Sequence, residues 1–272
     1  MFRYIREKIA KHRQKRTFKE YGYRIMALPL PGGGTVDYAQ WEHPSMGERL
    51  ALPAELAFFS KYIKNGDFAV DIGAQVGDTT LPMALAAGTA GMVLSLEPNP
   101  HAYKIAKANS ELNKDKTNIT VLDFAATATD GEFIFGSRDA SFDNGGIVGF
   151  ATNTVSNTRF RQKVQGRNLE NYLNQHYADR LPRLSFVKID TEGYDKEVIK
   201  SIIGLLKKYK PTIITECFKH LSQTERHELY DLLADQGYKV HYVSDFADGG
   251  APILLTRNDM MKWKHFDILA TA

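Results

Sequence analysis

Cysteine is almost missing from this sequence, and long apolar runs are missing altogether. Cys217 is the only cysteine among 272 residues, which excludes an internal disulfide and a zinc site made of several cysteines, and agrees with a reducing compartment. No apolar run approaches the ~18 residues of a membrane-spanning helix. The N-terminus also lacks the apolar stretch and the small-residue cleavage site of a secretory signal. We therefore expect a cytoplasmic protein.

The composition has no large excess of charge of either sign, but the charge is unevenly distributed. The formal net charge is +3. A content of 43% hydrophobic and 25% charged residues excludes a disordered or fibrous chain. Residues 1–24 hold nine Lys or Arg against two Glu, a charge of +7 that leaves −4 on the remainder. A nucleic-acid-binding protein usually spreads basic charge over its core domain. The pattern argues against a nucleic-acid partner and makes the basic arm an accessory.

The sequence divides into three parts by composition. Residues 1–27 form a basic extension, residues 28–52 a linker and lead-in rich in Gly and Pro, and residues 53–272 one domain with a substrate-side insert at about 135–166. Apolar β-branched runs predict strands, and apolar residues at helical spacing predict helices. The expected strands are 68–72, 92–96, 119–124, 184–189, 212–215, 238–243 and 252–256; the expected helices are 54–64, 79–87, 100–113, 169–177, 192–208 and 223–236.

The order of these elements predicts the fold class. Strands that alternate with helices need crossover connections, which give a largely parallel sheet covered on both faces. The last two strands are joined by a tight loop and must be antiparallel neighbours. The predicted fold is therefore α/β, a Rossmann-like, mostly parallel sheet with helices on both faces and a C-terminal antiparallel strand pair.

The clearest functional motif is VDIGAQVGDTT at residues 70–80, where a buried strand runs through a Gly-rich turn into a helix. Ligands of open α/β sheets bind at this end of the strands. Gly73 and Gly77 allow a tight turn and close approach of the backbone, and Thr79 can cap the helix. We expect a cofactor to bind over this turn.

The residues around the turn indicate which cofactor. A dinucleotide site needs G-x-G-x-x-G, whereas here Ala74 follows Gly73 and no third glycine stands at the required place. Asp71 at the strand mouth would repel a pyrophosphate but would suit a cofactor with ammonium and sulfonium charges. Glu97 ends the next strand, where a carboxylate can accept both ribose hydroxyls. The residues thus favour S-adenosylmethionine; the alternative is an ordinary turn with Asp71 as a solvated strand end.

Three segments in order carry a family resemblance. VDIGAQVGDTT, then LSLEPNP at residues 94–100, then VKIDTEGYDKEV at residues 187–198 resemble the FkbM-type class I methyltransferases over about residues 52–216. Weaker similarities are Glu55, Ala126, Asp130-Gly131, residues 165–172 and Glu216, and departures from the family pattern are Gln75, Asn168, Glu170 and Asp195. The resemblance implies the class I methyltransferase fold and methyl transfer from S-adenosylmethionine to oxygen, commonly a sugar or polyketide hydroxyl.

Motif and resemblance together give a set of expected site residues. The expected cofactor-binding residues are Asp71, Gly73, Ala74, Gly77, Asp78, Thr79, Thr80, Glu97, Pro98, Asn99, Ala126 and Asp190. The expected catalytic residues are Lys188, Asp190, Glu192, Glu216 and His220, since a sugar hydroxyl is a weak nucleophile that needs a base or a neighbouring cation. Structural alternatives stay open: Glu192 as a first-turn carboxylate, Lys188 as a partner that neutralises Asp190, and His220 as a surface histidine.

The need for a metal and the role of the insert are both left open by the sequence. A divalent metal shared by Asp190 and Glu216 is not favoured, because two carboxylates without a third ligand are a weak signal. The insert offers aromatic and amide side chains for an acceptor pocket, or for an edge hairpin: Phe142, Asp143, Asn144, Phe150, Asn153 and Asn157.

The basic arm also allows more than one interpretation. It places Phe2, Ile5 and Ile9 at helical spacing among basic residues, which fits peripheral membrane contact, packing on its own domain or a dimer partner, or a solvated end. The acceptor is expected to be a small molecule or a glycan. The alternative functions are an RNA methyltransferase and a non-catalytic, cofactor-binding scaffold protein. The oligomeric state is not readable from the sequence.

Overall fold

The computed structural model describes residues 16–49, 51–149, 158–244 and 250–272. The strands are β1 (Tyr23–Pro29), β2 (Thr35–Trp41), β3 (Phe68–Ile72), β4 (Met92–Leu96), β5 (Ile119–Leu122), β6 (Phe124–Thr127), β7 (Gly131–Ser137), β8 (Gly145–Ile147), β9 (Phe160–Asn168), β10 (Leu184–Ile189), β11 (Thr212–Cys217), β12 (Lys239–Val243), β13 (Ile253–Leu254) and β14 (Phe266–Thr271). The α-helices are α2 (Leu52–Phe59), α3 (Thr80–Ala87), α4 (Pro100–Leu112), α5 (Leu169–His176), α6 (Asp195–Ser201), α7 (Ile203–Tyr209) and α8 (Gln223–Ala234), with short 3-10 turns at Leu181–Arg183 and Arg257–Met261.

The described strands form a central eight-stranded sheet with the order β13-β12-β14-β11-β10-β3-β4-β5. Its middle strands β11, β10, β3, β4 and β5 are parallel, and β14 runs antiparallel to both of its neighbours. Alternate residues of β3 enter two different cores: Val70 packs in the core that contains helices α5 to α8, and Ala69 in the core that contains α2 and α3. The predicted Rossmann-like class I fold, with both faces covered, is confirmed.

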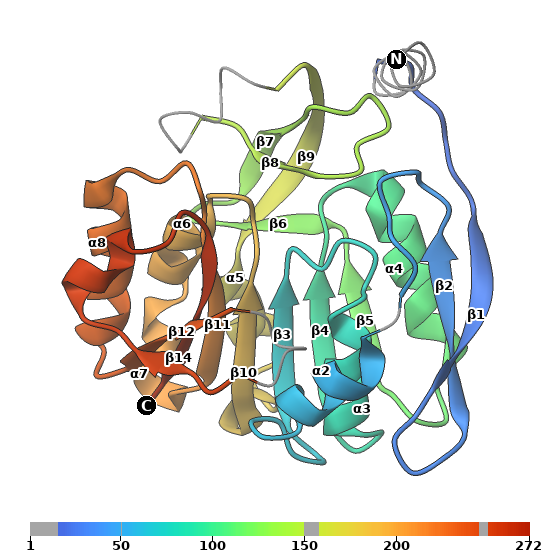
Figure 1. Cartoon of the computed structure of the whole chain (residues 1–272), viewed down its shortest axis with the longest axis horizontal. Coiled ribbons are helices and arrows are strands. Elements are labelled where there is room, and N and C mark those ends of the chain that lie inside the picture. Colours follow the sequence, from blue (N-terminus) through green and yellow to red (C-terminus); the bar gives the residue numbers. More distant parts are fainter. Residues whose placement is uncertain (1–15, 50, 150–157, 245–249) are drawn as a thin grey trace, which may run out of the picture.

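A second, four-stranded sheet lies over the carboxyl ends of the parallel strands (Figure 1). Its order is β6-β9-β7-β8, so the predicted insert is a small sheet and not a lone hairpin. The expected strand 119–124 divides into β5 and β6 around Asp123, and this break sends the chain from the central sheet into the small one. The small sheet therefore forms a roof over the edge where the predicted cofactor turn lies.

The segment predicted as a linker is folded. Strands β1 and β2 form an antiparallel hairpin whose turn contains Gly32, Gly33 and Gly34, all with positive φ. The hairpin is fixed to α4 by Asn109, whose side chain accepts a hydrogen bond from the backbone N–H of Ala39 at 2.7 Å and donates to its carbonyl oxygen at 3.2 Å. The glycines thus mark a turn inside a packed element and not a flexible connection.

Two further expectations differ from the structure near the C-terminus. The expected helix 192–208 is two helices, α6 and α7, separated at Ile202. Strand β14 was not predicted, and it inserts between β11 and β12. The predicted antiparallel pairing of the last two expected strands is confirmed as β12 with β13. Within the described residues, no helix is both long enough and apolar enough to cross a membrane.

Candidate functional site

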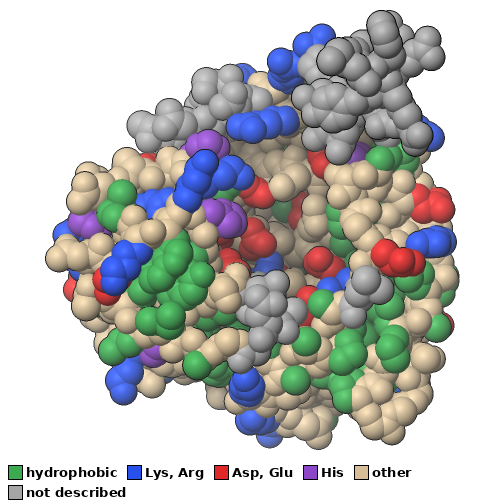
Figure 2. Space-filling view, viewed as in Figure 1, with side chains coloured by type: hydrophobic (Ala, Val, Ile, Leu, Met, Phe, Trp, Pro, Cys, Tyr) green, Lys and Arg blue, Asp and Glu red, His purple; other side chains and the backbone are tan. Residues whose placement is uncertain are grey.

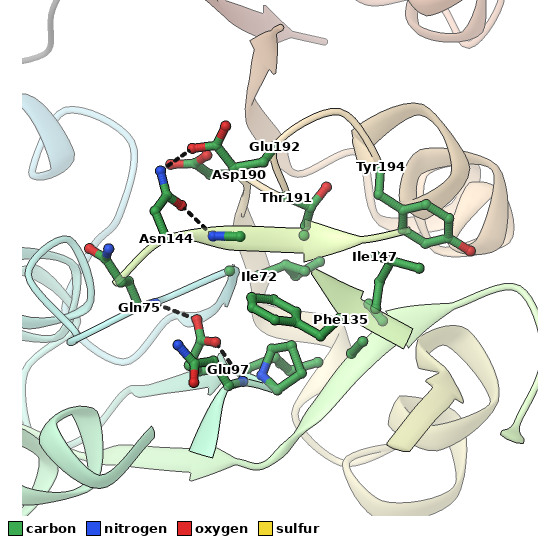
Figure 3. Close-up of a pocket in the computed structure, with 18 of the residues that line it drawn as sticks. Ile72, Gln75, Glu97, Phe135, Asn144, Ile147, Asp190, Thr191, Glu192 and Tyr194 are labelled. Atoms are coloured by element: carbon green, nitrogen blue, oxygen red, sulfur yellow. Dashed lines mark hydrogen bonds between the residues drawn. The ribbon is translucent and has the colours of Figure 1, made fainter. Parts of the chain in front are cut away.

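A pocket of about 340 Å³ opens at the carboxyl ends of β3, β4 and β10, between these strand ends and the small sheet, whose strand β6 also lines it (Figure 3). We call it the strand-end pocket. Its wall includes these of the predicted residues: Gly73, Asp78, Thr79, Glu97, Pro98, Asn99, Ala126, Lys188, Asp190 and Glu192. Aromatic and aliphatic side chains from the small sheet and nearby turns close it, namely Phe124, Phe135, Ile147 and Tyr194. The sequence motifs from three separate segments therefore meet in one cavity.

Gly73 brings two of these segments into contact. It has φ +78°, and a Cβ at this position would lie 1.9 Å from the carbonyl oxygen of Asp190. The backbone N–H groups of Gly73 and Ala74 both donate to the carbonyl oxygen of Leu96, each at 3.0 Å. Only glycine permits this approach, so the turn after β3 is held directly against the ends of β4 and β10.

Glu97 lies in the wall with its carboxylate oriented by the backbone. One oxygen accepts a hydrogen bond from the N–H of Gln75 at 2.8 Å, and the other accepts one from the N–H of Asn99 at 2.8 Å. The side chain is only 5% exposed, and burial raises the pKa of Glu97 to about 7 although both hydrogen bonds oppose the shift. A buried carboxylate fixed in this way fits a neighbouring pair of hydroxyl groups, as a ribose presents.

Asp71 does not face the pocket, which corrects the expectation that it contacts the cofactor. It is 0% exposed, accepts hydrogen bonds from the hydroxyls of Thr79 at 3.1 Å and Thr80 at 2.6 Å, and lies 3.4 Å from the ammonium of Lys188. Thr79 uses its hydroxyl here and does not cap the helix through its side chain. Asp71 therefore holds the pocket floor together beneath the surface.

Three other expected cofactor residues lie outside the wall for the same kind of reason. Ala74 and Thr80 are buried, and Gly77 packs against α4, where a Cβ would lie 3.7 Å from the Cα of Ala106. These residues shape the turn and its fit to the neighbouring helix. The sequence identified the right loop but not which of its residues are exposed to a ligand.

Lys188 links the buried floor to the open pocket. Its ammonium lies 3.4 Å from Asp71 and 3.3 Å from Asp190, whose side chain is 47% exposed. Burial alone would lower the pKa of Lys188, but the two carboxylates raise it, so the lysine stays charged. The contacts thus agree with the alternative in which Lys188 neutralises Asp190. Both residues also line the pocket.

Glu192 is one of two non-glycine residues in the wall of the strand-end pocket with a positive φ, the other being Gln75. The φ of Glu192 is +56°, a left-handed conformation that non-glycine residues rarely adopt, so Glu192 is not a first-turn residue of α6. The side-chain amide of Asn144 donates to its carboxylate at 2.6 Å, and burial raises the pKa of Glu192 against the effect of this bond (Figure 3). Asp195 fixes the same loop by accepting hydrogen bonds from the hydroxyl of Thr191 at 3.0 Å and the N–H of Gly193 at 3.1 Å.

A second pocket of about 250 Å³ continues from the first on the insert side, and we call it the insert pocket. The two pockets share Glu192 and the segment from Asp143 to Ile147. His220 lines the insert pocket only, and Glu216 lines neither. Glu216 lies 3.1 Å from Nε2 of His265, and burial with nearby carboxylates raises its pKa to about 10. Because Glu216 lies outside both pockets and beside His265, the structure gives no support to its expected role as a base.

The insert is bound to the cofactor turn through its backbone. The amide of Gln75 donates to the carbonyl oxygen of Asp143 at 2.7 Å, and the amide of Asn99 donates to that of Phe142 at 2.5 Å. Asp143 and Asn144 line both pockets, whereas Phe142 is buried and stacks on His101 with ring centroids 5.8 Å apart. The insert is thus both a pocket wall and a packed sheet edge. Phe150, Asn153 and Asn157 lie outside the described residues.

A metal shared by Asp190 and Glu216 finds no support in the geometry. In the part of the chain that the structure describes, the group of three metal-type ligands is instead His43, Asp139 and Asp143. There Nδ1 of His43 lies 2.6 Å from the hydroxyl of Ser45 and accepts the N–H of Ser45 at 3.2 Å, and Nε2 lies 3.7 Å from Asp139.

Sequence reasoning missed other parts of the wall. Glu55 and Thr191 line the strand-end pocket, and Glu55 is held by an ion pair with Arg49. In the sequence, Glu55 carries only a weak family similarity. Phe135 and Ile147 carry no motif and come together only because β7 and β8 pair.

The fold is Rossmann-like with a pocket at the strand ends beside the motif loop, and the family comparison identifies the class of protein. Residues 71–240 match the model of the methyltransferase FkbM domain. The chain belongs to the FkbM methyltransferase family, and its cofactor is S-adenosylmethionine.

Solved structures show only remote similarity. Methyltransferase FkbM from Methylobacillus flagellatus KT matches at 13% identity and TM-score 0.47, over 79% of this chain and 50% of that one, so this chain spans about half of its length. A SAM-dependent methyltransferase from Aquifex aeolicus matches at 14% identity and TM-score 0.42, over 84% and 93% of the two chains. A SAM-dependent O-methyltransferase from Thermotoga maritima matches at 13% identity and TM-score 0.40, over 90% and 77%. No curated protein matches the chain in sequence.

Proposed function

We propose that this protein transfers the methyl group of S-adenosylmethionine to a hydroxyl oxygen of a glycan or of a glycosylated or polyketide metabolite. The observation that carries the proposal is the position of Glu192, which lines both pockets. One pocket contains the cofactor turn and Glu97, and the other is walled by the insert. A group at their junction can contact an acceptor hydroxyl next to a methyl donor.

The residues at the junction suit oxygen as the acceptor atom. When bound, the cofactor supplies a methyl group activated by a positive sulfonium, so the protein mainly positions the acceptor and removes its proton. Glu192 has a raised pKa, as a base for a hydroxyl requires, and Asn144 orients its carboxylate. Asp190 lies beside the charged Lys188, which keeps a cation close to any oxygen that loses its proton.

Labelled-methyl transfer tests the proposal. The protein is incubated with S-adenosylmethionine carrying a labelled methyl group and with cell-envelope glycan, polyketide and RNA fractions. We expect label in the glycan or polyketide fraction, in a product that is stable as a methyl ether. The matched control is Glu111→Gln, a change of the same type on the exposed surface of α4. Label in RNA alone, or equal activity of Glu192→Gln and the control, would contradict the proposal.

We also propose that the basic N-terminal arm contacts an anionic membrane surface. The apolar residues of the expected helix, Phe2, Ile5 and Ile9, lie outside the described residues. Just after residue 16 the chain is attached to the folded domain, because the backbone N–H of Lys19 donates to the hydroxyl of Ser141 at 2.9 Å. A chain that begins at residue 17 therefore removes the arm and keeps this contact. Loss of sedimentation with anionic liposomes on this deletion supports the proposal; unchanged sedimentation, or none by the full chain, refutes it.

A further inference from the structure

The mouth of the insert pocket is basic. Arg138, between β7 and β8, and Lys219 and His220, directly after β11, all line it. In the space-filling view, Lys, Arg and His side chains gather along the rim of the central hollow, and carboxylates lie within it (Figure 2). Arg138 and Lys219 are exposed, and the described residues offer neither of them a carboxylate partner within ion-pair distance. These two cations are available to a ligand.

The positive charges lie close enough together to lower the pKa of the neighbouring histidine, His220. Burial lowers the pKa of His220, and Lys219, Arg138 and Lys264 lower it further. The four basic groups are therefore close enough to act on one another. Such a cluster repels itself in the free protein, and an anion bound among its members relieves this repulsion.

Two of the three acidic residues that line the insert pocket are engaged elsewhere, and the third, Asp143, has a carboxylate oxygen within 4.8 Å of ligand atoms of His43 and Asp139. Asp139 is 4% exposed, lies 3.7 Å from Nε2 of His43 and accepts the N–H of Ser141 at 2.8 Å. The carboxylate of Glu192 is bonded to Asn144 at the inner end, next to the strand-end pocket. The pocket is thus polarised, with cations at the mouth and a candidate base at the inner end.

We infer that the acceptor carries an anionic group, a phosphate or a carboxylate, that binds Arg138 and Lys219 while its hydroxyl reaches Glu192. The inference rests on the proposed function, because it takes Glu192 as the place where the hydroxyl reacts. A pocket of about 250 Å³ suits an acceptor portion of the size of a monosaccharide. Guanidinium and ammonium groups bind phosphate and carboxylate oxygens through charge-assisted hydrogen bonds, which are stronger than the bonds that the same groups make to the neutral hydroxyls of a sugar.

Binding of defined probes tests the inference without any turnover. The full chain is titrated by calorimetry with glucose 6-phosphate, glucuronate and neutral methyl glucoside at low and high salt. We expect one of the two anionic probes to bind at least tenfold more tightly than methyl glucoside at low salt, and the preferred probe identifies the anion. Nuclear magnetic resonance of the His220 ring gives a second readout, since the bound anion raises the pKa of this histidine.

The double variant Arg138→Gln/Lys219→Gln is expected to lose at least tenfold in affinity for the anionic probe. Its matched control, Lys107→Gln/Lys114→Gln, removes two charges from exposed positions around Glu111 and is expected to bind normally. Thermal melting shows that both variants are folded.

Four results overturn the inference: no probe binds, methyl glucoside binds equally well, the double variant keeps its affinity, or a short RNA oligonucleotide binds more tightly than either anionic probe. The two proposals fail separately. Anion binding without methylation of any hydroxyl removes the proposed function, whereas methylation of a neutral acceptor that is insensitive to the double variant removes only the inference.

Discussion

Glu97 provides the sharpest test of the cofactor site, because its pKa of about 7 lies within the working range of pH. Only the ionised carboxylate can accept its two backbone N–H bonds and also accept from a ribose diol. If the ionised form alone binds, protonation weakens the affinity by a factor of about two at pH 7 and about tenfold at pH 6, relative to pH 8. A tenfold change corresponds to about 1.4 kcal/mol of binding free energy.

The same group has the opposite effect on folding. Burial raises the pKa of Glu97 in the folded protein from an ordinary 4.5 to about 7. The resulting stabilisation is fully present below pH 4.5 and is lost as the pH rises through 7, an effect of about 3 kcal/mol for a fully buried group. Between pH 6 and 8 the free protein therefore becomes less stable as its affinity for the cofactor increases.

Calorimetry with methylthioadenosine separates this effect from the chemistry of the ligand. This compound has the adenine and the ribose but no group that titrates between pH 6 and 8, unlike the α-amino group of S-adenosylmethionine. We expect Glu97→Gln to bind about 1 to 3 kcal/mol more weakly at pH 8 and to show no pH dependence. Glu111→Gln serves as the control. Equal affinity of the parent at pH 6 and pH 8, or a pH dependence that survives in Glu97→Gln, would refute the reasoning.

Other parts of the site give further predictions. Asp71→Asn leaves the buried ammonium of Lys188 with one half-exposed partner, so the free energy of unfolding in urea should fall by about 3 kcal/mol. Most of this loss should be recovered when Lys188→Met is added. A loss below about 1 kcal/mol would contradict a buried pair. Asp190→Asn and Glu192→Gln should each lower turnover by about 100-fold and change cofactor affinity by only a few-fold, and full activity in both would return these carboxylates to a structural role. Activity should be unchanged in EDTA, and a loss that added Mg²⁺ restores would show that a metal is needed.

The local parts of the fold could be predicted from the sequence, and the long-range parts could not. The strand, turn and helix around Gly73 are contiguous, so their pattern is complete within a few residues. Strand β14 forms only by inserting between β11 and β12, and no local signal specifies that pairing. Strands β1 and β2 could not be predicted for a similar reason. In the sequence their three turn glycines resemble a linker, and only the packing of the hairpin on α4 shows that they form a turn.

The site shows the same limit at the level of single residues. The loop was identified correctly, but Asp71 was expected to face a positive cofactor. In the sheet, Lys188 of β10 stands in register with Asp71 of β3, and the two charges neutralise each other below the pocket. The contact of Asn144 with Glu192 joins residues 48 positions apart and depends on the fold of the insert. Charge and spacing in the sequence do not contain either fact.

The attachment of the insert to the cofactor turn has a consequence for how this protein could evolve. The side-chain amides of Gln75 and Asn99 donate hydrogen bonds to backbone carbonyl oxygens of the insert, and every amino acid supplies such an oxygen. Substitutions among the pocket-lining side chains of the insert therefore leave these two hydrogen bonds to its backbone in place. A new acceptor preference can arise by substitution along this one segment, whereas a change at Gln75 or Asn99 would disturb every acceptor alike.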